Sequence, residues 1–434
     1  MQWSSRVMLR LLIENILDRR NVFMKIKDIG RVVTGKTPLT GVNEYYGGNI
    51  MFISPSDLHG DYLIEKSEKT ITEEGLKSIE SNSIDGISVL TGCIGWDMGN
   101  VAMCNSRCAT NQQINAIIDF NHKLVDPRYV YYWLKGKKDY LFSIASVTRT
   151  PILSKSVFEN IDIPLPSLKI QERVTKLLSL IDEKIRKNHQ INDYLEQQLQ
   201  LLYDYWFTQY NFPNEDGQPY KASNGLMVWN KMINHLIPAD WKVKPLGTIC
   251  SFRNGINYDK NVDGNTIYKI INVRNISSST LFLDESNFDE ICLPKQQGDK
   301  YYVSDDSIII ARSGIPGATR ILCNPSSNII FCGFIICCTP SDNTLQNYLT
   351  LYLRQFEGSS ATQTGGSILK NVSQETLKNL IVPIPPQSLL NQFNDSILPI
   401  YNLINSNTKE NVQLITLRDW LLPMLMNGQT TIED

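Results

Sequence analysis

The chain has 434 residues, of which 42% are hydrophobic and 20% charged, so it can form two globular domains with some extended structure beside them. This composition excludes a disordered or low-complexity protein. A formal net charge of -2 at pH 7 argues against a basic nucleic-acid binder that acts alone. The sequence contains no run of 18 apolar residues, so we expect no membrane-spanning helix and a cytoplasmic protein.

The cysteines and histidines predict no metal site. The nine cysteines include no CxxC pair, and the four histidines stand singly, without HExxH or another ligand spacing. An odd number of cysteines is typical of free thiols in a reducing cytosol.

Residues 1–23 precede the first expected domain. Apolar residues recur there at helical spacing, while Glu14 and Asp18 interrupt any signal-peptide core. The segment is therefore either a short docking helix or an extension upstream of a natural start at Met24.

The rest of the chain consists of two copies of one sequence repeat. MKIKDIGRV from Met24 matches WKVKPLGTI from Trp241, and IDIPLPSLKIQERV from Ile161 matches LIVPIPPQSLLNQF from Leu380. The second match has an offset of 219 residues and continues without a gap for about 40 residues. Between these anchors the copies diverge. A shared scaffold with unlike variable segments is what two recognition modules need if their targets differ, and simple duplication with drift is the alternative.

A long helix is expected after the proline pair of each copy. Apolar residues recur every three or four positions, which is a coiled-coil period, and at about 1.5 Å per residue each helix would span roughly 60 Å. Each apolar stripe is interrupted by two asparagines, namely Asn188 and Asn192, or Asn407 and Asn411. Buried asparagines commonly fix register. We therefore expect an antiparallel coiled coil that separates the two domains; the alternative is that each helix packs on its own domain.

The expected fold class is α+β, with two mixed α/β recognition domains in pseudo-twofold repeat, each followed by a long helix. Pro399 predicts a kink in the second helix, and Pro423 with Asn427-Gly428 predicts its end. The expected divisions are an N-terminal extension (1–23), domain 1 (24–166), spacer helix 1 (167–210), a linker (211–239), domain 2 (240–385) and spacer helix 2 (386–428).

Three segments resemble those of type I restriction-modification specificity subunits: GRVVTGKTPLTGVNEYYGGNIMFISPSDL (30–58), ATNQQINAI (109–117) and IPLP (163–166) before a long helix. The similarity covers about Met24 to Gly428. TGKTP followed by EYYGG and PSDL is its most specific part. The second copy departs from this pattern, because it has RNGINYDK in place of TGKTP.

The resemblance implies a non-catalytic subunit whose two target-recognition domains each read one half of a bipartite, asymmetric double-stranded DNA target. It also implies two methyltransferase subunits as partners and, in the full complex, restriction subunits. S-adenosylmethionine, ATP and magnesium would then belong to the partners, with no cofactor in this chain. The residues agree, because the sequence contains no GxGxxG, no Walker phosphate loop and no adenine-methylation motif.

Polar loop residues are the candidates for DNA contact, because Asn and Gln can pair with adenine, and Arg and Lys with guanine. Each has a structural alternative, such as capping a strand or forming an ion pair at the edge of the core. The candidates are Lys36, Thr37, Tyr45, Asn111, Gln112, Gln113 and Arg149 in domain 1, and Arg253, Asn254, Arg312, Ser313 and Lys370 in domain 2.

Charge leaves other functions open. Lys and Arg number 15 against 16 Asp and Glu in residues 24–166, and 13 against 13 in residues 240–384. Phosphate charge must then be met by a local basic patch or by partner subunits. The neutral domains also fit a coiled-coil adaptor whose two heads bind protein or RNA. An enzyme with an unrecognised site is a third possibility.

Overall fold

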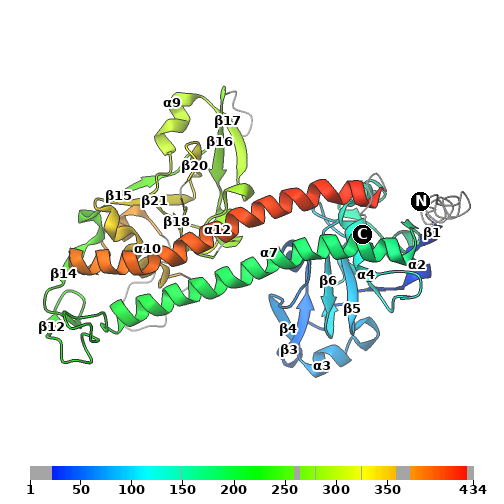
Figure 1. Cartoon of the computed structure of the whole chain (residues 1–434), viewed down its shortest axis with the longest axis horizontal. Coiled ribbons are helices and arrows are strands. Elements are labelled where there is room, and N and C mark those ends of the chain that lie inside the picture. Colours follow the sequence, from blue (N-terminus) through cyan, green and yellow to red (C-terminus); the bar gives the residue numbers. More distant parts are fainter. Residues whose placement is uncertain are drawn as a thin grey trace, which may run out of the picture. The chain divides into compact units, whose positions relative to one another are not determined.

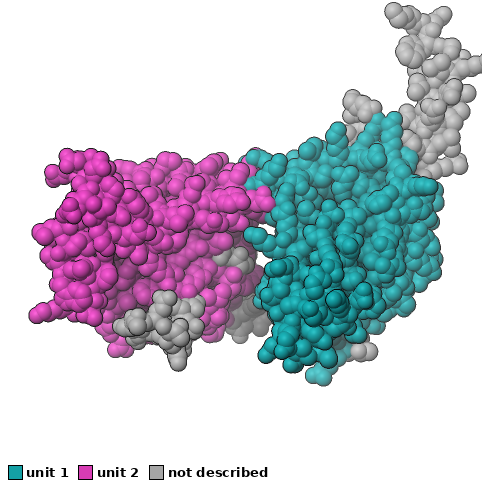
Figure 2. All heavy atoms as spheres, turned by 90° about the horizontal axis from the view of Figure 1, so that it is seen from below, with its two compact units in different colours: residues 1–187, 411–434 teal, residues 188–410 magenta. Residues whose placement is uncertain are grey.

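The computed structural model describes residues 22–147, 149–258, 264–278, 280–323, 325–357 and 372–427. Lys370, most of the N-terminal extension and Gly428 lie outside these ranges. The chain forms two compact units, one of residues 1–187 with 411–434 and the other of residues 188–410 (Figure 2). Within the described residues, no helix is both long and apolar enough to cross a membrane.

A four-stranded antiparallel sheet forms the centre of the first unit. Its strand order is β2 (Arg31–Thr34), β8 (Ile114–Ile118), β5 (Ile87–Gly92) and β6 (Val101–Asn105). The two central strands are apolar runs whose residues are almost all buried, as expected of strands covered on both faces. A three-stranded sheet adjoins it, in the order β4 (Lys69–Ile71), β3 (Tyr46–Ile53) and β7 (Cys108–Thr110).

The second unit repeats this topology strand for strand. Its four-stranded sheet has the order β15 (Cys250–Asn254), β21 (Ile335–Pro340), β18 (Ile308–Ala311) and β19 (Thr319–Ile321). Its three-stranded sheet has the order β17 (Asp289–Leu293), β16 (Thr266–Ile271) and β20 (Ile329–Phe331). The duplication seen in the sequence is therefore a duplication of the fold.

Further elements are equivalent in the two copies. The equivalent pairs are α4 (Pro127–Lys135) with α10 (Gln346–Arg354), α6 (Lys155–Glu159) with α11 (Gln374–Lys378), β11 (Asp162–Leu165) with β22 (Ile381–Ile384), and their partner strands β1 (Val22–Lys25) with β14 (Lys242–Pro245). The remaining elements are α2 (Ile26–Ile29), α3 (Glu73–Lys77), α5 (Lys138–Ser143), β9 (Ser146–Val147), β10 (Pro151–Ile152), β12 (Met227–Asn230), β13 (His235–Pro238), α8 (Val273–Ser278) and α9 (Lys295–Gly298).

The two expected long helices are α7 (Leu168–Tyr203) and α12 (Gln387–Met426) (Figure 1). In the first unit, Arg418 contacts Asp182 and the Nδ2 of Asn411 donates to the Ile185 carbonyl at 3.5 Å. In the second unit, Asn407 Nδ2 donates to Asn192 Oδ1 at 2.8 Å. Residue numbers rise along one helix as they fall along the other, so the pairing is antiparallel. The helix α12 continues through Pro399 and ends three residues after Pro423.

The hydrophobic core of each unit includes residues from the end of the long helix of the other copy. The core of the first unit includes Leu422, Leu425 and Met426 from the end of α12. The core of the second includes Tyr203, Trp206 and Phe207 from the end of α7 and the turn after it. These two sets occupy equivalent positions in the repeat, 219 residues apart.

Candidate nucleic-acid interface

Three loops of the first unit leave the four-stranded sheet at the same end. The strand β2 ends at Thr34, which pairs with Asn115 near the start of β8. The strand β5 ends at Gly92, which pairs with Ile114. The segments after Thr34, before Ile114 and after Gly92 are therefore neighbours, and we call this end of the sheet the recognition end of the first unit.

The TGKTP segment lies against the Asn111–Gln113 turn at this end. Thr37 Oγ1 donates to Gln112 Oε1 at 2.7 Å. The backbone N–H of Gly35 donates to the Ile114 carbonyl at 3.0 Å. A Cβ on Gly35 would lie only 2.1 Å from the carbonyl oxygen of Asn111, so only glycine permits this approach. Lys36 projects from the same segment into solvent.

The side chains of the 111–113 turn differ in their hydrogen bonds and exposure. Asn111 Oδ1 accepts from the backbone N–H of Gln113 at 3.1 Å, and Asn111 Nδ2 donates to Gln113 Oε1 at 3.0 Å. These bonds shape the turn, so Asn111 and Gln113 are partly used by the fold. Gln112, in contrast, is exposed at the apex.

Backbone hydrogen bonds place the segment that carries Arg149 at the recognition end. It lies exposed between β9 and β10. The N–H of Leu153 donates to Cys93 O at 2.8 Å, and the N–H of Cys93 donates to Gln113 O at 2.7 Å. The hairpin that carries Arg149 is thus fixed beside the polar turn.

Tyr45 is placed differently from the other candidates of the first unit. It lies half-buried in the turn before β3, where its carbonyl oxygen accepts from the N–H of Thr72 at 3.0 Å. The next residue, Tyr46, reaches the recognition end instead, because its hydroxyl donates to Pro38 O at 2.8 Å. The sequence motif EYYGG therefore contributes a tyrosine that supports the TGKTP loop.

The second unit has an equivalent recognition end. Asn254 at the end of β15 pairs with Ile336, and Ala311 at the end of β18 pairs with Ile335. The N–H of Arg312 donates to Phe334 O at 2.9 Å, as that of Cys93 does to Gln113 O. Asn254 and Arg312 are exposed there, with Ser313 half-buried beside them. Arg312 Nη1 also donates to Gly333 O at 3.2 Å.

Arg253 points away from this end into the unit. Its Nη1 donates to Lys300 O at 3.1 Å and its Nη2 to Tyr302 O at 2.8 Å. Its guanidinium carbon lies 5.8 Å from the centre of the Phe331 ring. Adjacent residues of a strand face opposite sides, so Asn254 is exposed while Arg253 ties β15 to the neighbouring loop.

Two exposed aromatic residues at the recognition ends were not among the sequence candidates. Trp96 is 70% exposed and lies in the loop after β5, and Phe334 is 61% exposed and directly precedes β21. The available signal was an aromatic residue within a short glycine-bounded segment after an apolar strand. In the first unit this segment is Gly95-Trp96-Asp97-Met98-Gly99, whose two glycines have positive φ angles of 108° and 90°.

Charged side chains hold the Trp96 loop. Lys138 Nζ lies 2.8 Å from Asp97 Oδ1, and His59 Nε2 lies 3.0 Å from Asp97 Oδ2. Burial acts to raise the pKa of Asp97, but the hydrogen bond and charge of Lys138, with His59, hold it below its usual value. Below the loop, burial raises the pKa of the Cys93 thiol to about 12, so this thiol is neutral.

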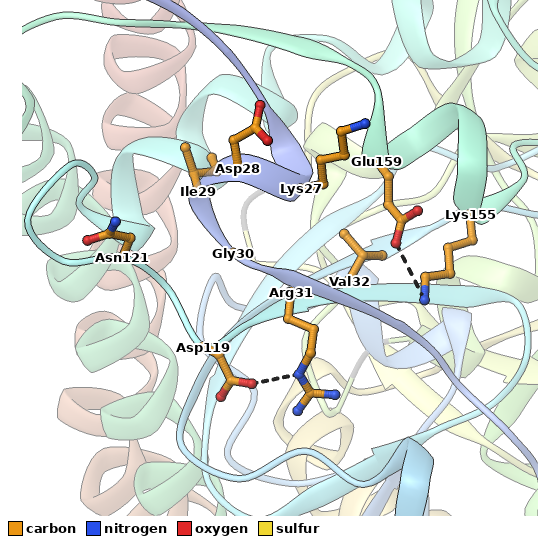
Figure 3. A pocket seen from close by; sticks show the side chains of 10 residues that line it. All are labelled: Lys27, Asp28, Ile29, Gly30, Arg31, Val32, Asp119, Asn121, Lys155 and Glu159. Carbon is orange, nitrogen blue, oxygen red and sulfur yellow. Dashed lines mark hydrogen bonds and ion pairs between the residues drawn. The ribbon is translucent and has the colours of Figure 1, made fainter.

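A pocket of about 400 Å³ lies at the opposite end of the same sheet (Figure 3). In it Arg31 Nε lies 2.7 Å from Asp119 Oδ2, and Lys155 Nζ lies 3.4 Å from Glu159 Oε1. These charges neutralise one another, which does not suit a charged ligand. Across the described ranges, no group of three or more His, Cys, Asp or Glu side chains could hold a metal ion.

Comparison with known proteins identifies relatives for both copies. The type I restriction modification DNA specificity domain family matches residues 19–197 and 238–414. The type I restriction enzyme MjaIX specificity subunit of Methanocaldococcus jannaschii is 29% identical over 94% of this chain and 93% of its own length. The HindI specificity subunit of Haemophilus influenzae is 30% identical over 41% of this chain and 39% of its own. The crystal structure of an S subunit from M. genitalium aligns with 93% of this chain and 96% of its own, at 14% identity and a TM-score of 0.47.

Proposed function

Because the chain belongs to the family of type I restriction-modification specificity subunits, which recognise DNA and are not themselves catalysts, we propose that its two recognition ends read the two halves of a bipartite DNA target. The observation that carries the proposal is the repeated sheet end. The equivalent ends of the two sheets present exposed polar side chains, with Lys36 and Gln112 in the first unit and Asn254 and Arg312 in the second. Unlike side chains on equivalent scaffolds favour two unlike half-sites.

We assign base contact to the exposed candidates and loop support to the half-buried ones. Gln112 and Arg149 have the side chains that pair with adenine and guanine edges in the major groove. Asn111 and Gln113 act mainly by shaping the turn on which Gln112 stands. Thr37 orients Gln112 through its hydroxyl, and Tyr45 is a weaker candidate because it lies in the turn before β3. The contribution of Lys370 stays a prediction from the sequence.

The neutral charge of both domains indicates that partner subunits supply much of the phosphate contact. A protein that neutralises few phosphates has little non-specific affinity for DNA. We propose that two methyltransferase subunits bind this chain and, in the full complex, two restriction subunits, and that the assembly works in the cytoplasm. S-adenosylmethionine, ATP and magnesium would be held by those partners.

The long helices α7 and α12 would set the spacing of the half-sites at about one helical turn of DNA, roughly 34 Å.

The test combines target mapping with binding. Adenine methylation is mapped in DNA from cells that express the chain with its methyltransferase partner, and we expect an asymmetric, interrupted motif. Fluorescence anisotropy then measures binding of the assembled complex to duplexes altered in one half-site. Arg149→Ala should weaken binding to the first half-site by about tenfold, as loss of a base contact does. Arg107→Ala is the control, because this exposed arginine pairs with Glu73 at the opposite end of the sheet.

A symmetric or continuous motif would overturn the proposal that the two ends read two half-sites. Unchanged affinity of Arg149→Ala at matched salt would overturn the assignment of base contact to Arg149. The balanced charge of the domains favours one other function, an adaptor that binds RNA or protein. Binding of single-stranded RNA with the affinity expected for the duplex would support that adaptor instead.

A further inference from the structure

Each recognition end presents one strongly exposed aromatic ring among its polar side chains. In the first unit this is Trp96, 70% exposed, and in the second it is Phe334, 61% exposed. Exposed apolar residues are common singly, so exposure alone has little meaning. Here, however, both rings lie at equivalent sheet ends, beside the polar residues assigned above to base contact.

Hydrogen bonds within its loop keep the Trp96 side chain exposed to solvent. The N–H of Met98 donates to Gly95 O at 3.2 Å, and the N–H of Gly99 donates to Gly92 O at 2.8 Å. The ion pair of Asp97 with Lys138 and the contact of Asp97 with His59 anchor the same loop from outside. On one side the indole lies against Phe142, with ring centres 6.2 Å apart. The loop therefore keeps a large apolar surface in contact with solvent at a defined place.

Phe334 occupies the place that Gln113 has in the first copy. Its carbonyl oxygen accepts from the N–H of Arg312, as that of Gln113 does from Cys93. The N–H of Gly255 donates to Ile335 O at 3.2 Å, as that of Gly35 does to Ile114 O. One scaffold position thus has an amide in one copy and a phenyl ring in the other, next to the exposed Arg312.

The chemistry of duplex DNA limits what such rings can read. Along the base edges in the major groove, the apolar group is the 5-methyl of thymine, and aromatic or aliphatic side chains recognise it by contact. The contact removes apolar area from water on both sides and needs no hydrogen-bond partner. We propose that Trp96 contacts a thymine methyl in the first half-site and Phe334 one in the second. The assignment rests on the proposed function of the recognition ends.

The experiment removes thymine methyl groups one at a time. Duplexes carrying the mapped target are synthesised with a single deoxyuridine in place of each thymine, and the complex with its methyltransferase partner is titrated against them. Loss of one buried methyl should weaken binding by about fourfold at one thymine in each half-site. Trp96→Ala should weaken binding of the unmodified target by about tenfold and abolish the uracil effect in the first half-site alone. Phe334→Ala should do the same in the second half-site alone.

Matched aromatic residues elsewhere provide the controls. Trp229 on β12 is 57% exposed and Phe23 on β1 is 68% exposed, so Trp229→Ala and Phe23→Ala should leave both affinity and uracil sensitivity unchanged. The inference is overturned if no uracil substitution matters, if the variants stay sensitive to uracil, or if a half-site has no A·T pair. Failure of the unmodified complex to prefer its target over random duplex is a separate result, because it contradicts the proposed function itself.

Discussion

At the recognition ends, neighbouring residues of similar chemistry have different roles, and the direction of each side chain decides which. Asn111 bonds within its own turn, whereas Gln112 projects from it. Arg253 bonds two carbonyl groups inside the second unit, whereas Asn254 is exposed. A polar side chain that satisfies buried backbone groups contributes to stability, and one that faces water is available for DNA.

Arg253→Ala tests this distinction. The substitution removes two charge-assisted hydrogen bonds and leaves the Lys300 and Tyr302 carbonyls without them, so unfolding of the second unit should become easier by roughly 2 kcal/mol. Urea denaturation followed by tryptophan fluorescence measures the change. Arg312→Ala is the control: it removes an exposed side chain with one solvent-exposed hydrogen bond, to the Gly333 carbonyl, and should change stability little. Unchanged stability of Arg253→Ala with weaker binding to the second half-site would instead support direct DNA contact.

The cysteines allow a second test at the same scale. All nine are free, seven are buried and Cys292 is exposed. Burial raises the pKa of Cys93 to about 12, so hardly any reactive thiolate is present at pH 8. Iodoacetamide at that pH should label Cys292 within minutes and Cys93 only after denaturation, as measured by peptide mass spectrometry. Equal labelling rates would show that the base of the recognition end opens.

The sign of the linked pH effect follows from the same shift. The folded-state pKa of Cys93 lies above its usual value of 9.0, so its neutral thiol supports the folded state fully below that value. This contribution is lost as the pH rises towards about 12.

Among elements, close contact between backbones brings the recognition loops together. Gly35 lies against the Asn111 carbonyl, and Gly255 lies equally close to the Cys332 carbonyl in the second unit. Around these glycines the loops differ in every exposed side chain proposed to contact DNA. A conserved geometry with exchanged surface residues is how one scaffold can serve two targets.

Gly35→Ala should separate the two polar loops of the first unit. Its methyl group would meet Asn111 O at 2.1 Å and Thr110 Oγ1 at 2.2 Å, so a loop must move. We expect binding to the first half-site to fall by at least about tenfold, since displaced contacts lose most of their energy, while binding to the second half-site is retained. Gly41→Ala is the matched control, because its methyl would meet no atom within 4 Å. Equal binding by both variants would contradict this account of the loops.

In the whole molecule, the two copies are joined by exchange of helix ends. The first unit contains the end of α12, and the second contains the end of α7. In the first unit the exchange includes a buried ion pair, in which Arg418 and Asp182 are 2.8 Å apart and only 12% and 3% exposed. Tyr132 adds a hydrogen bond to the same carboxylate at 2.7 Å. Neither unit is therefore the product of one copy alone.

Arg418→Ala should destabilise the first unit strongly. It leaves the Asp182 carboxylate buried without its cation, which costs about 3 kcal/mol when one partner of a buried pair is removed. Limited proteolysis should show faster cleavage within residues 22–187 and unchanged cleavage within the second unit. Asp419→Ala is the control, because Asp419 is 56% exposed and exposed ion pairs contribute little. Equal stability of the two variants would show that the end of α12 is not needed by the first unit.

The sequence by itself determined the features that depend on periodicity and self-similarity. The duplication, the long helices with their asparagines and the family were all readable from it, because a helical period and a constant offset are local or repeated signals. The grouping of Lys36, Thr37, Gln112 and Arg149 as loop residues also followed from their polar type and turn context.

The tertiary structure alone decided which of these residues meet. Thr34 and Asn115 are 81 residues apart in the chain, yet their side chains lie 2.7 Å apart because β2 and β8 are neighbours in the sheet. Strand order depends on packing of the whole domain, and no local pattern encodes it. The inward direction of Arg253, the exposure of Trp96 and Phe334, and the exchange of helix ends depend on it too. In each case the deciding interaction joins residues far apart in sequence.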